Sequence, residues 1–125
     1  MKKIVNAENA PKAIGPYSHA VAAGELLFTS GQIGLVPETG KLVEGGVTAE
    51  AAQAFDNLGA ILRENGMDLS NVVKTTCFLT DLTEFSKVNA VYAEAFPTAP
   101  PARSCVQVAA LPAGAAVEIE AVAVR

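Results

Sequence analysis

The 125-residue sequence lacks the features that mark membrane, secreted and nucleic-acid-binding proteins. Lysine and arginine form no long run, and the net charge is −4, so the chain offers no basic patch for phosphates. No uncharged apolar stretch approaches the length of a membrane span, and no apolar region follows the two lysines at the start. We therefore expect a soluble, cytoplasmic protein that binds neither nucleic acid nor membranes.

Cysteine and histidine are too few and too scattered to build a metal site. Cys77 and Cys105 have no second cysteine nearby, and His19 is the only histidine. Zinc sites need closely spaced sets of such ligands. We expect no metal and no cofactor, with reduced thiols in an intracellular protein. Cys77 is expected in the core and His19 on the surface, as is usual for histidine.

Apolar residues, in contrast, are plentiful. Half of the residues are hydrophobic and the mean hydropathy is +0.31, which is high for a chain of this length. This composition indicates buried contacts between subunits. No linker, repeat or low-complexity tract divides the chain, so residues 1–125 form one domain.

The pattern of apolar residues predicts two helices. The first begins at a cap on Thr48 and ends at Asn65-Gly66, with one buried stripe formed by Ala51, Phe55, Leu58 and Leu62. The second opens at Asp81, which with Glu84 resembles a capping box, and its buried stripe is Leu82, Phe85, Val88, Tyr92 and Phe96.

Strands are predicted before, between and after the helices. A hairpin turns at Gly24, a strand rich in β-branched residues covers 72–80, and two final strands cover roughly 102–109 and 116–124. The predicted fold is α+β, with two helices on one face of a mixed sheet.

Arg103 is unusual because it lies within an otherwise apolar strand and needs a partner for its planar fork of donors. If a four-residue loop at 111–114 joins the last two strands as a hairpin, Arg103, Cys105, Glu118 and Glu120 project to one side. Such a face fits an exposed ion pair between strands, and it also fits a partly buried pocket or a subunit interface. The valines among these residues favour the pocket or the interface.

Seven motifs along nearly the whole chain support a family assignment. They are Asn9-Ala10-Pro11, Ala13-Ile14-Gly15-Pro16-Tyr17, Thr29-Ser30-Gly31-Gln32-Ile33, Val73-Lys74-Thr75-Thr76, Val88-Asn89, Pro101-Ala102-Arg103-Ser104 and Glu118-Ile119-Glu120-Ala121. With these motifs the sequence resembles the RidA (YjgF-type) imine deaminases. The resemblance implies a chorismate-mutase-like α+β chain that assembles as a homotrimer, with sites in the clefts between subunits.

The resemblance also implies an activity. Members that carry the arginine hydrolyse reactive 2-enamino and 2-imino acids, such as 2-aminoacrylate and 2-aminocrotonate with their imine tautomers, to 2-keto acids and ammonia. These compounds otherwise damage pyridoxal-phosphate enzymes. The alternative is a trimer without catalysis, acting as a small-anion-binding regulator or as a chaperone-like holdase.

Within that family pattern, Arg103 binds the substrate carboxylate and Glu118 handles the water and the proton. The remaining substrate-binding residues implied are Tyr17, Ser30, Gly31, Asn89 and Cys105. From composition alone, Tyr17 is equally a core or interface ring, and Asn89 is equally a local polar contact. Glu120 is expected to be a structural carboxylate. Cys105 is less favoured as a nucleophile, because no histidine is placed to activate it.

Overall fold

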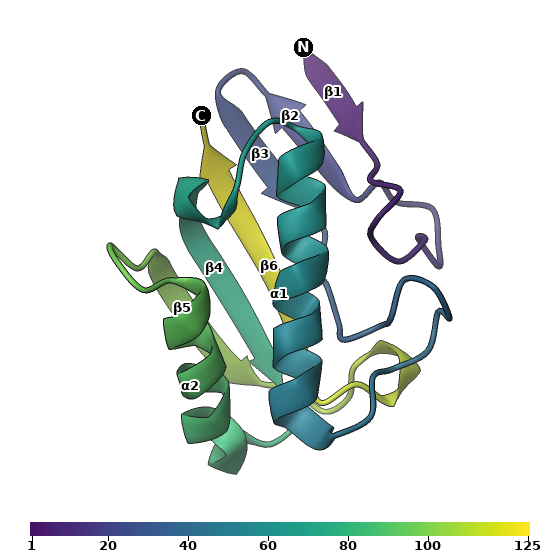
Figure 1. Ribbon diagram of the computed structural model, residues 1–125, viewed down its shortest axis with the longest axis vertical. Helices are drawn as coiled ribbons and strands as arrows, with labels where there is room; N and C mark the ends of the chain where they lie inside the picture. The colour runs from purple at the N-terminus through teal and green to yellow at the C-terminus, as the bar shows by residue number, and fades with distance from the viewer.

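The computed structural model describes all residues 1–125 and contains one six-stranded sheet. The strand order across the sheet is β1-β2-β3-β6-β4-β5 (Figure 1). The strands are β1 Lys2–Val5, β2 Ala20–Ala23, β3 Leu26–Thr29, β4 Val72–Leu79, β5 Ala102–Gln107 and β6 Val117–Val124. The predicted hairpin is confirmed, because β2 and β3 pair across a turn at Gly24, whose φ is 60°.

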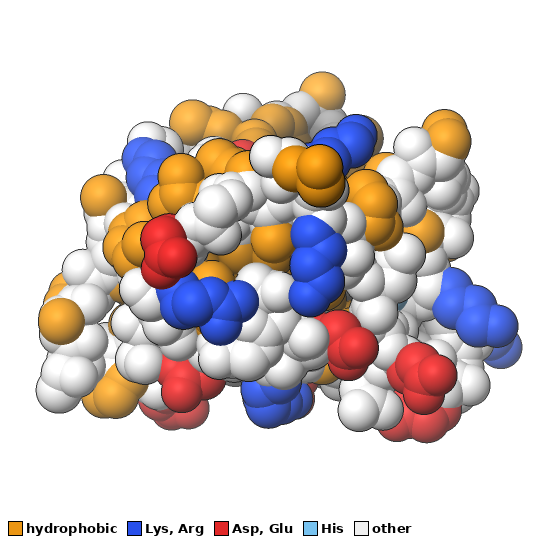
Figure 2. Space-filling view, turned by 90° about the horizontal axis from the view of Figure 1, so that it is seen from above, with side chains coloured by type: hydrophobic (Ala, Val, Ile, Leu, Met, Phe, Trp, Pro, Cys, Tyr) orange, Lys and Arg blue, Asp and Glu red, His pale blue; other side chains and the backbone are white.

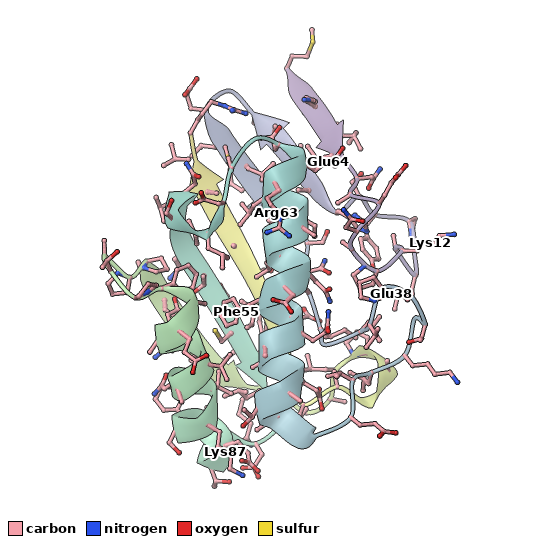
Figure 3. The ribbon with its side chains drawn as sticks, in the orientation of Figure 1. Lys12, Glu38, Phe55, Arg63, Glu64 and Lys87 are labelled. Carbon is pink, nitrogen blue, oxygen red and sulfur yellow. The ribbon has the colours of Figure 1, made fainter.

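Two helices, α1 Gly46–Glu64 and α2 Phe85–Ala95, cover one face of this sheet (Figure 1). The core lies between the helices and the sheet, where Leu58, Leu62 and Ile119 are fully buried. The ring of Phe55 projects from α1 toward α2 (Figure 3), and its centroid lies 5.7 Å from that of Tyr92. The predicted class, two helices on one face of a mixed sheet, is confirmed.

The start of α1 differs from the prediction. Gly45 caps the helix with φ of 118°, followed by Gly46 at 80°, so Thr48 already lies inside the first turn. Both angles are in the left-handed region, which glycine adopts readily. The predicted end is confirmed, because Asn65 caps the helix and Gly66 follows with φ of 70°. All four residues of the predicted stripe are buried.

The start of α2 also differs. Asp81 accepts a hydrogen bond from the Thr83 amide, but it caps a short 3-10 turn, Leu82–Glu84, that precedes α2. Leu82 and Phe85 are exposed because they lie on this turn and at the first helical position. The rest of the predicted stripe, from Val88 onward, is buried.

The last two strands do not form the predicted hairpin. β6 inserts between β3 and β4 and is antiparallel to both, whereas β5 lies at the edge, parallel to β4. The apolar side chains explain this order. Every second residue of β6 is almost fully buried, starting with Val117 at 0% exposure, so β6 belongs in the centre. No residue of β5 is fully buried, which suits an edge strand.

No helix covers the other face of the sheet (Figure 1). This face carries exposed apolar side chains from both ends of the sheet, which are Ile4, Leu26, Phe28 and Val106. In the view from above, hydrophobic side chains gather along the edge of the molecule away from the helices (Figure 2). We call this surface the open face.

Candidate functional site

Arg103 lies on the helix-covered side of the edge strand β5. Its guanidinium carbon is 4.6 Å from the centroid of the Tyr92 ring and 5.2 Å from that of Phe85. One guanidinium nitrogen donates a hydrogen bond of 2.7 Å to Oδ1 of Asn89. The rings and the amide fix the plane of the guanidinium, because cations favour the faces of aromatic rings.

Most donors of the Arg103 fork remain free. The chain contains a single ion pair, between Lys87 and Glu84, so no carboxylate neutralises Arg103. A hollow of about 450 Å³ opens beside it, and we call this the arginine hollow. Its lining residues are Asn89, Tyr92, Ala93, Phe96, Pro100, Pro101 and Arg103. The guanidinium is therefore available to an anion from outside the chain.

Cys105 follows Arg103 on the same side of β5 and opposite the buried Cys77 of β4. Burial raises the pKa of the Cys105 thiol, and the opposing effect of Arg103 does not cancel the increase. Burial, with Cys105 next to it, raises the pKa of Cys77 to about 11. Neither thiol is activated as a nucleophile, and the core position predicted for Cys77 is confirmed.

Glu118 lies elsewhere, at a pocket of about 280 Å³ that we call the Glu118 pocket. Its lining residues are Pro11, Lys12, Ile14, Tyr17, Ser30, Gly31, Gln32, Ile33, Leu35, Pro112 and Glu118. Tyr17, Ser30 and Gly31, for which substrate binding was predicted, therefore line the same pocket as Glu118. The side chain of Lys12 points outward, away from the rest of the chain (Figure 3).

Gly31 packs directly against the Glu118 carboxylate. A β-carbon at residue 31 would lie 2.3 Å from Oε2 of Glu118, which is far inside van der Waals contact. The Gly31 amide makes no hydrogen bond within the chain. Glycine therefore lets the carboxylate sit against the backbone and leaves one N–H free for a ligand.

The hydroxyls of Ser30 and Tyr17 have different roles. The Ser30 hydroxyl donates to the Ser18 carbonyl at 2.7 Å, so its proton fixes the loop. The Tyr17 hydroxyl accepts from the Ile14 amide at 3.2 Å, which leaves its own proton free to donate into the pocket.

Partial burial raises the pKa of the Glu118 carboxyl, and the negative charge of Glu120 raises it further. Arg103, on the other face of the sheet, does not contribute to this shift. A raised pKa brings the carboxyl closer to the range in which it can both donate and accept a proton, which suits general acid and base chemistry.

The predicted arrangement of the four polar residues is therefore wrong. β4 lies between β5 and β6, with Thr75 opposite both Arg103 and Ala121, so Glu118 and Glu120 point to the open face. Two strand spacings and three residues of rise separate the Cα atoms of Arg103 and Glu118 by about 14 Å. One chain thus cannot bring both side chains to a small substrate.

His19 was predicted on the surface, but it is buried, with only 4% of its area exposed. Both of its ring nitrogens form hydrogen bonds with backbone groups of the segment that precedes it.

The contact of the Phe85 and Tyr92 rings with Arg103 was not predicted. A signal was present, because Phe85, Asn89 and Tyr92 follow one another at spacings of four and three and therefore share one side of a helix. The predicted core stripe includes Phe85 and Tyr92, and of these two only Tyr92 is buried.

No three His, Cys, Asp or Glu side chains converge in a way that could hold a metal ion. Neither helix combines the length and apolar composition needed to cross a bilayer. In the view from above, basic and acidic side chains alternate and form no continuous basic stripe (Figure 2).

Comparison with known proteins gives consistent matches. The family model described as endoribonuclease L-PSP matches residues 7–125. The mouse protein named 2-iminobutanoate/2-iminopropanoate deaminase is 51% identical over 125 residues, covering 100% of this chain and 93% of its own length. The Arabidopsis thaliana protein named Reactive Intermediate Deaminase A, chloroplastic, is 52% identical over 122 residues, covering 98% and 65%.

A solved structure agrees with these matches. The crystal structure of RidA from the Antarctic bacterium Psychrobacter superposes with a TM-score of 0.95 at 43% sequence identity. The match covers 98% of this chain and 99% of that chain.

Proposed function

Because the chain belongs to the endoribonuclease L-PSP family, also called the YjgF/RidA family, we propose that it hydrolyses reactive 2-imino acids and their enamine tautomers to 2-keto acids and ammonia. The substrates would include 2-aminoacrylate and 2-aminocrotonate with their imines, which are electrophiles that damage pyridoxal-phosphate enzymes. The names of relatives at about half identity over the full chain support this activity. The two free cysteines fit the reducing cytoplasm as its compartment.

The observation that carries the proposal is the division of the site into two incomplete halves. The Glu118 pocket has a carboxyl, a free amide and a hydroxyl, but no fixed cation for a substrate carboxylate. The arginine hollow has an unpaired guanidinium but no acid or base. Each half supplies what the other lacks.

We propose that the halves meet between copies of the chain in a homotrimer. Arg103 of one copy would face Glu118 of the next, giving three equivalent clefts. The open face, with its exposed apolar side chains, supports a large contact between copies. A head-to-tail contact of two different surfaces closes into a ring, which is the symmetry that a trimer needs.

In such a cleft the planar fork of Arg103 binds the substrate carboxylate through two parallel hydrogen bonds. The Phe85 and Tyr92 rings and Asn89 hold this fork in one plane, so the position of the imine carbon is set by the bound carboxylate. The free amide of Gly31 and the Tyr17 hydroxyl donate to the other side of the substrate.

Glu118 handles the protons of the reaction. A water oxygen attacks the imine carbon, one water proton passes through the carboxyl to the imine nitrogen, and a carbinolamine forms. The carboxyl then takes the hydroxyl proton of the carbinolamine and returns it to nitrogen as the C–N bond breaks. The products are a 2-keto acid and ammonia, so one imino acid and one water are consumed in balance.

A coupled assay tests this function. Threonine or serine dehydratase generates the imino acid in place, and keto-acid release is followed with the wild type, Arg103→Ala, or no added protein. Arg63→Ala is a matched control, because it removes an arginine from the exposed outer side of α1 (Figure 3).

We expect acceleration by the wild type and by Arg63→Ala, and none by Arg103→Ala. If folded wild type does not exceed the spontaneous rate, the activity is wrong, and a regulator that binds small anions or a holdase becomes the better description. RNA cleavage is not favoured by the net charge of −4 or by the scattered charges.

A further inference from the structure

His19 is a buried titratable group that the proposed chemistry does not use. Its backbone joins the N-terminal segment to the sheet, because its amide donates to Oδ1 of Asn6 at 3.0 Å and its carbonyl accepts from the Ser30 amide at 2.8 Å. Its ring makes two further hydrogen bonds to the same segment, residues 6–17, which has no regular secondary structure.

The two ring bonds define the protonation of the imidazole. The Ala7 amide can only donate, so Nδ1, at 2.9 Å, must accept and carries no proton. The ring proton is therefore on Nε2, which donates to the Pro11 carbonyl at 2.7 Å. Only the neutral imidazole satisfies both partners.

The segment held in this way forms one wall of the Glu118 pocket. Pro11, whose carbonyl His19 binds, lines the pocket together with Ile14 and Tyr17. The Tyr17 hydroxyl accepts from the Ile14 amide, so the tyrosine and the turn before it form one unit. The bonds at Ala7 and Pro11 therefore help to tie this unit to the start of β2.

We propose that neutral His19 is a positioning residue that holds residues 6–17 as the wall of the Glu118 pocket, and that its protonation releases this wall. The effect on catalysis rests on the proposed function, but the effect on the segment does not. A proton on Nδ1 would turn the acceptor of the Ala7 amide into a second donor, so one bond would become a repulsion.

Charged groups around the ring do not replace these bonds. The titratable side chains lining the hollow beside His19 are Glu8, Lys12 and Tyr17, and none of them bonds to the imidazole. β2 and β3 carry no titratable residue, and the two lysines of β1 pair with the far end of β2.

Two variants separate the hydrogen bonds from the proton. His19→Gln keeps one acceptor and one donor on a side chain that does not titrate. His19→Leu fills a similar volume and keeps neither. If His19 acts through its neutral form, glutamine should rescue what leucine loses.

A lysine-specific protease reports the state of the segment directly. It cuts after Lys12, which lies between Pro11 and the turn that carries Tyr17, and after Lys41, in an exposed loop that His19 does not contact. The ratio of the two cleavage rates corrects for the pH dependence of the protease. At about pH 8 we expect the ratio to rise about tenfold or more in His19→Leu and to stay near the wild-type value in His19→Gln.

Acid should reproduce the leucine variant in the wild type only. On acidification the ratio should rise in the wild type and stay flat in His19→Gln, because the histidine ring can gain a proton on Nδ1 and the glutamine amide cannot. For imine hydrolysis, His19→Leu should raise KM by about tenfold with a smaller change in kcat, and His19→Gln should extend activity to lower pH.

The outcomes are distinguishable. An unchanged cleavage ratio in folded His19→Leu, or the same rise with acid in the wild type and His19→Gln, overturns the proposal. If His19→Leu does not fold, the comparison of the wild type with His19→Gln decides alone. If the wild type hydrolyses no imine, the proposed function fails, and the cleavage ratio still decides the role of His19.

Discussion

Arg103 and Glu118 point to opposite faces of one sheet, with β4 between the strands that carry them. Their side chains diverge, so the two cannot bind the same small acid within one chain. Each of the two side chains nevertheless lines a hollow, Glu118 the Glu118 pocket and Arg103 the arginine hollow. A contact between two copies is the simplest way to bring a guanidinium and a carboxyl of this chain together.

Mixing two inactive variants should restore activity. Arg103→Ala retains Glu118, and Glu118→Gln retains Arg103, so a mixed trimer contains some clefts with both groups. In every trimer that contains both chains, one of the three clefts keeps both groups intact. Coexpression of the two chains with different tags, followed by the imine assay on the doubly tagged fraction, measures this.

Each variant alone should be inactive. The control is a chain that carries both Arg103→Ala and Glu118→Gln, coexpressed with the same two tags. No recovery in mixed trimers would show that Arg103 and Glu118 do not meet across an interface.

Gly31→Ala should impair catalysis without unfolding the chain. The new β-carbon would meet the Glu118 carboxylate at 2.3 Å, so the carboxyl must move away from the substrate. We expect kcat to fall by about tenfold or more, since displacement of an acid or base by about an ångström is enough.

Gly15→Ala is the matched control, because its β-carbon would touch only the Tyr17 ring, at 3.5 Å. Equal activity of the two alanine variants would contradict a role for Gly31 in placing Glu118. Steady-state kinetics and circular dichroism on both proteins supply the comparison.

Glu118→Gln should increase stability in a pH-dependent way. Burial raises the pKa of Glu118 in the folded chain above its ordinary 4.5, so folding favours the protonated form. The stabilisation by Glu118 is complete below 4.5 and is lost as the pH rises through the folded-state pKa. The variant should therefore melt at a higher temperature than the wild type at about pH 8, and this gain should vanish near pH 4.

Thermal unfolding across this range provides the measurement, with Glu38→Gln in an exposed loop as the control for net charge. A gain from Glu118→Gln that does not vary with pH would point to packing instead of titration.

Glu120→Gln should shift the pH dependence of catalysis while preserving the rate at the optimum. The charge of Glu120 raises the pKa of Glu118, so its removal lowers that pKa and moves the corresponding limb of the rate profile to lower pH. Glu118→Gln should instead slow hydrolysis by roughly 10² or more. If the two variants lost activity equally, the acid and base role would have to be reassigned between Glu118 and Glu120.

Much of the fold could be predicted because its determinants are local. The stripe from Ala51 to Leu62 defines α1, the β-branched run defines β4, and Gly24 and Gly66 mark a turn and a helix end. The caps were predicted less well, since Thr48 and Gly45 lie within one turn of each other and both favour a helix start.

The arrangement of the last strands could not be predicted, because it depends on contacts distant in sequence. The turn Pro112–Gly114 resembles a hairpin connection, yet the chain passes from one side of β4 to the other there. Side-chain alternation within β5 and β6 was correct, but an error in pairing placed Arg103 and Glu118 on the same face. His19 was misplaced for a similar reason, since its partners Ala7 and Pro11 lie in an irregular segment without a sequence signal.

The central place of β6 affects how the protein is made. β6 is the last strand along the chain, yet it joins the two halves of the sheet, which share no other strand pairing (Figure 1). While a ribosome is synthesising the chain, β1 to β3 and β4 with β5 can exist only as separate pieces with unpaired edges. Unpaired edges favour aggregation, and the sheet can be completed only after β6 has been made.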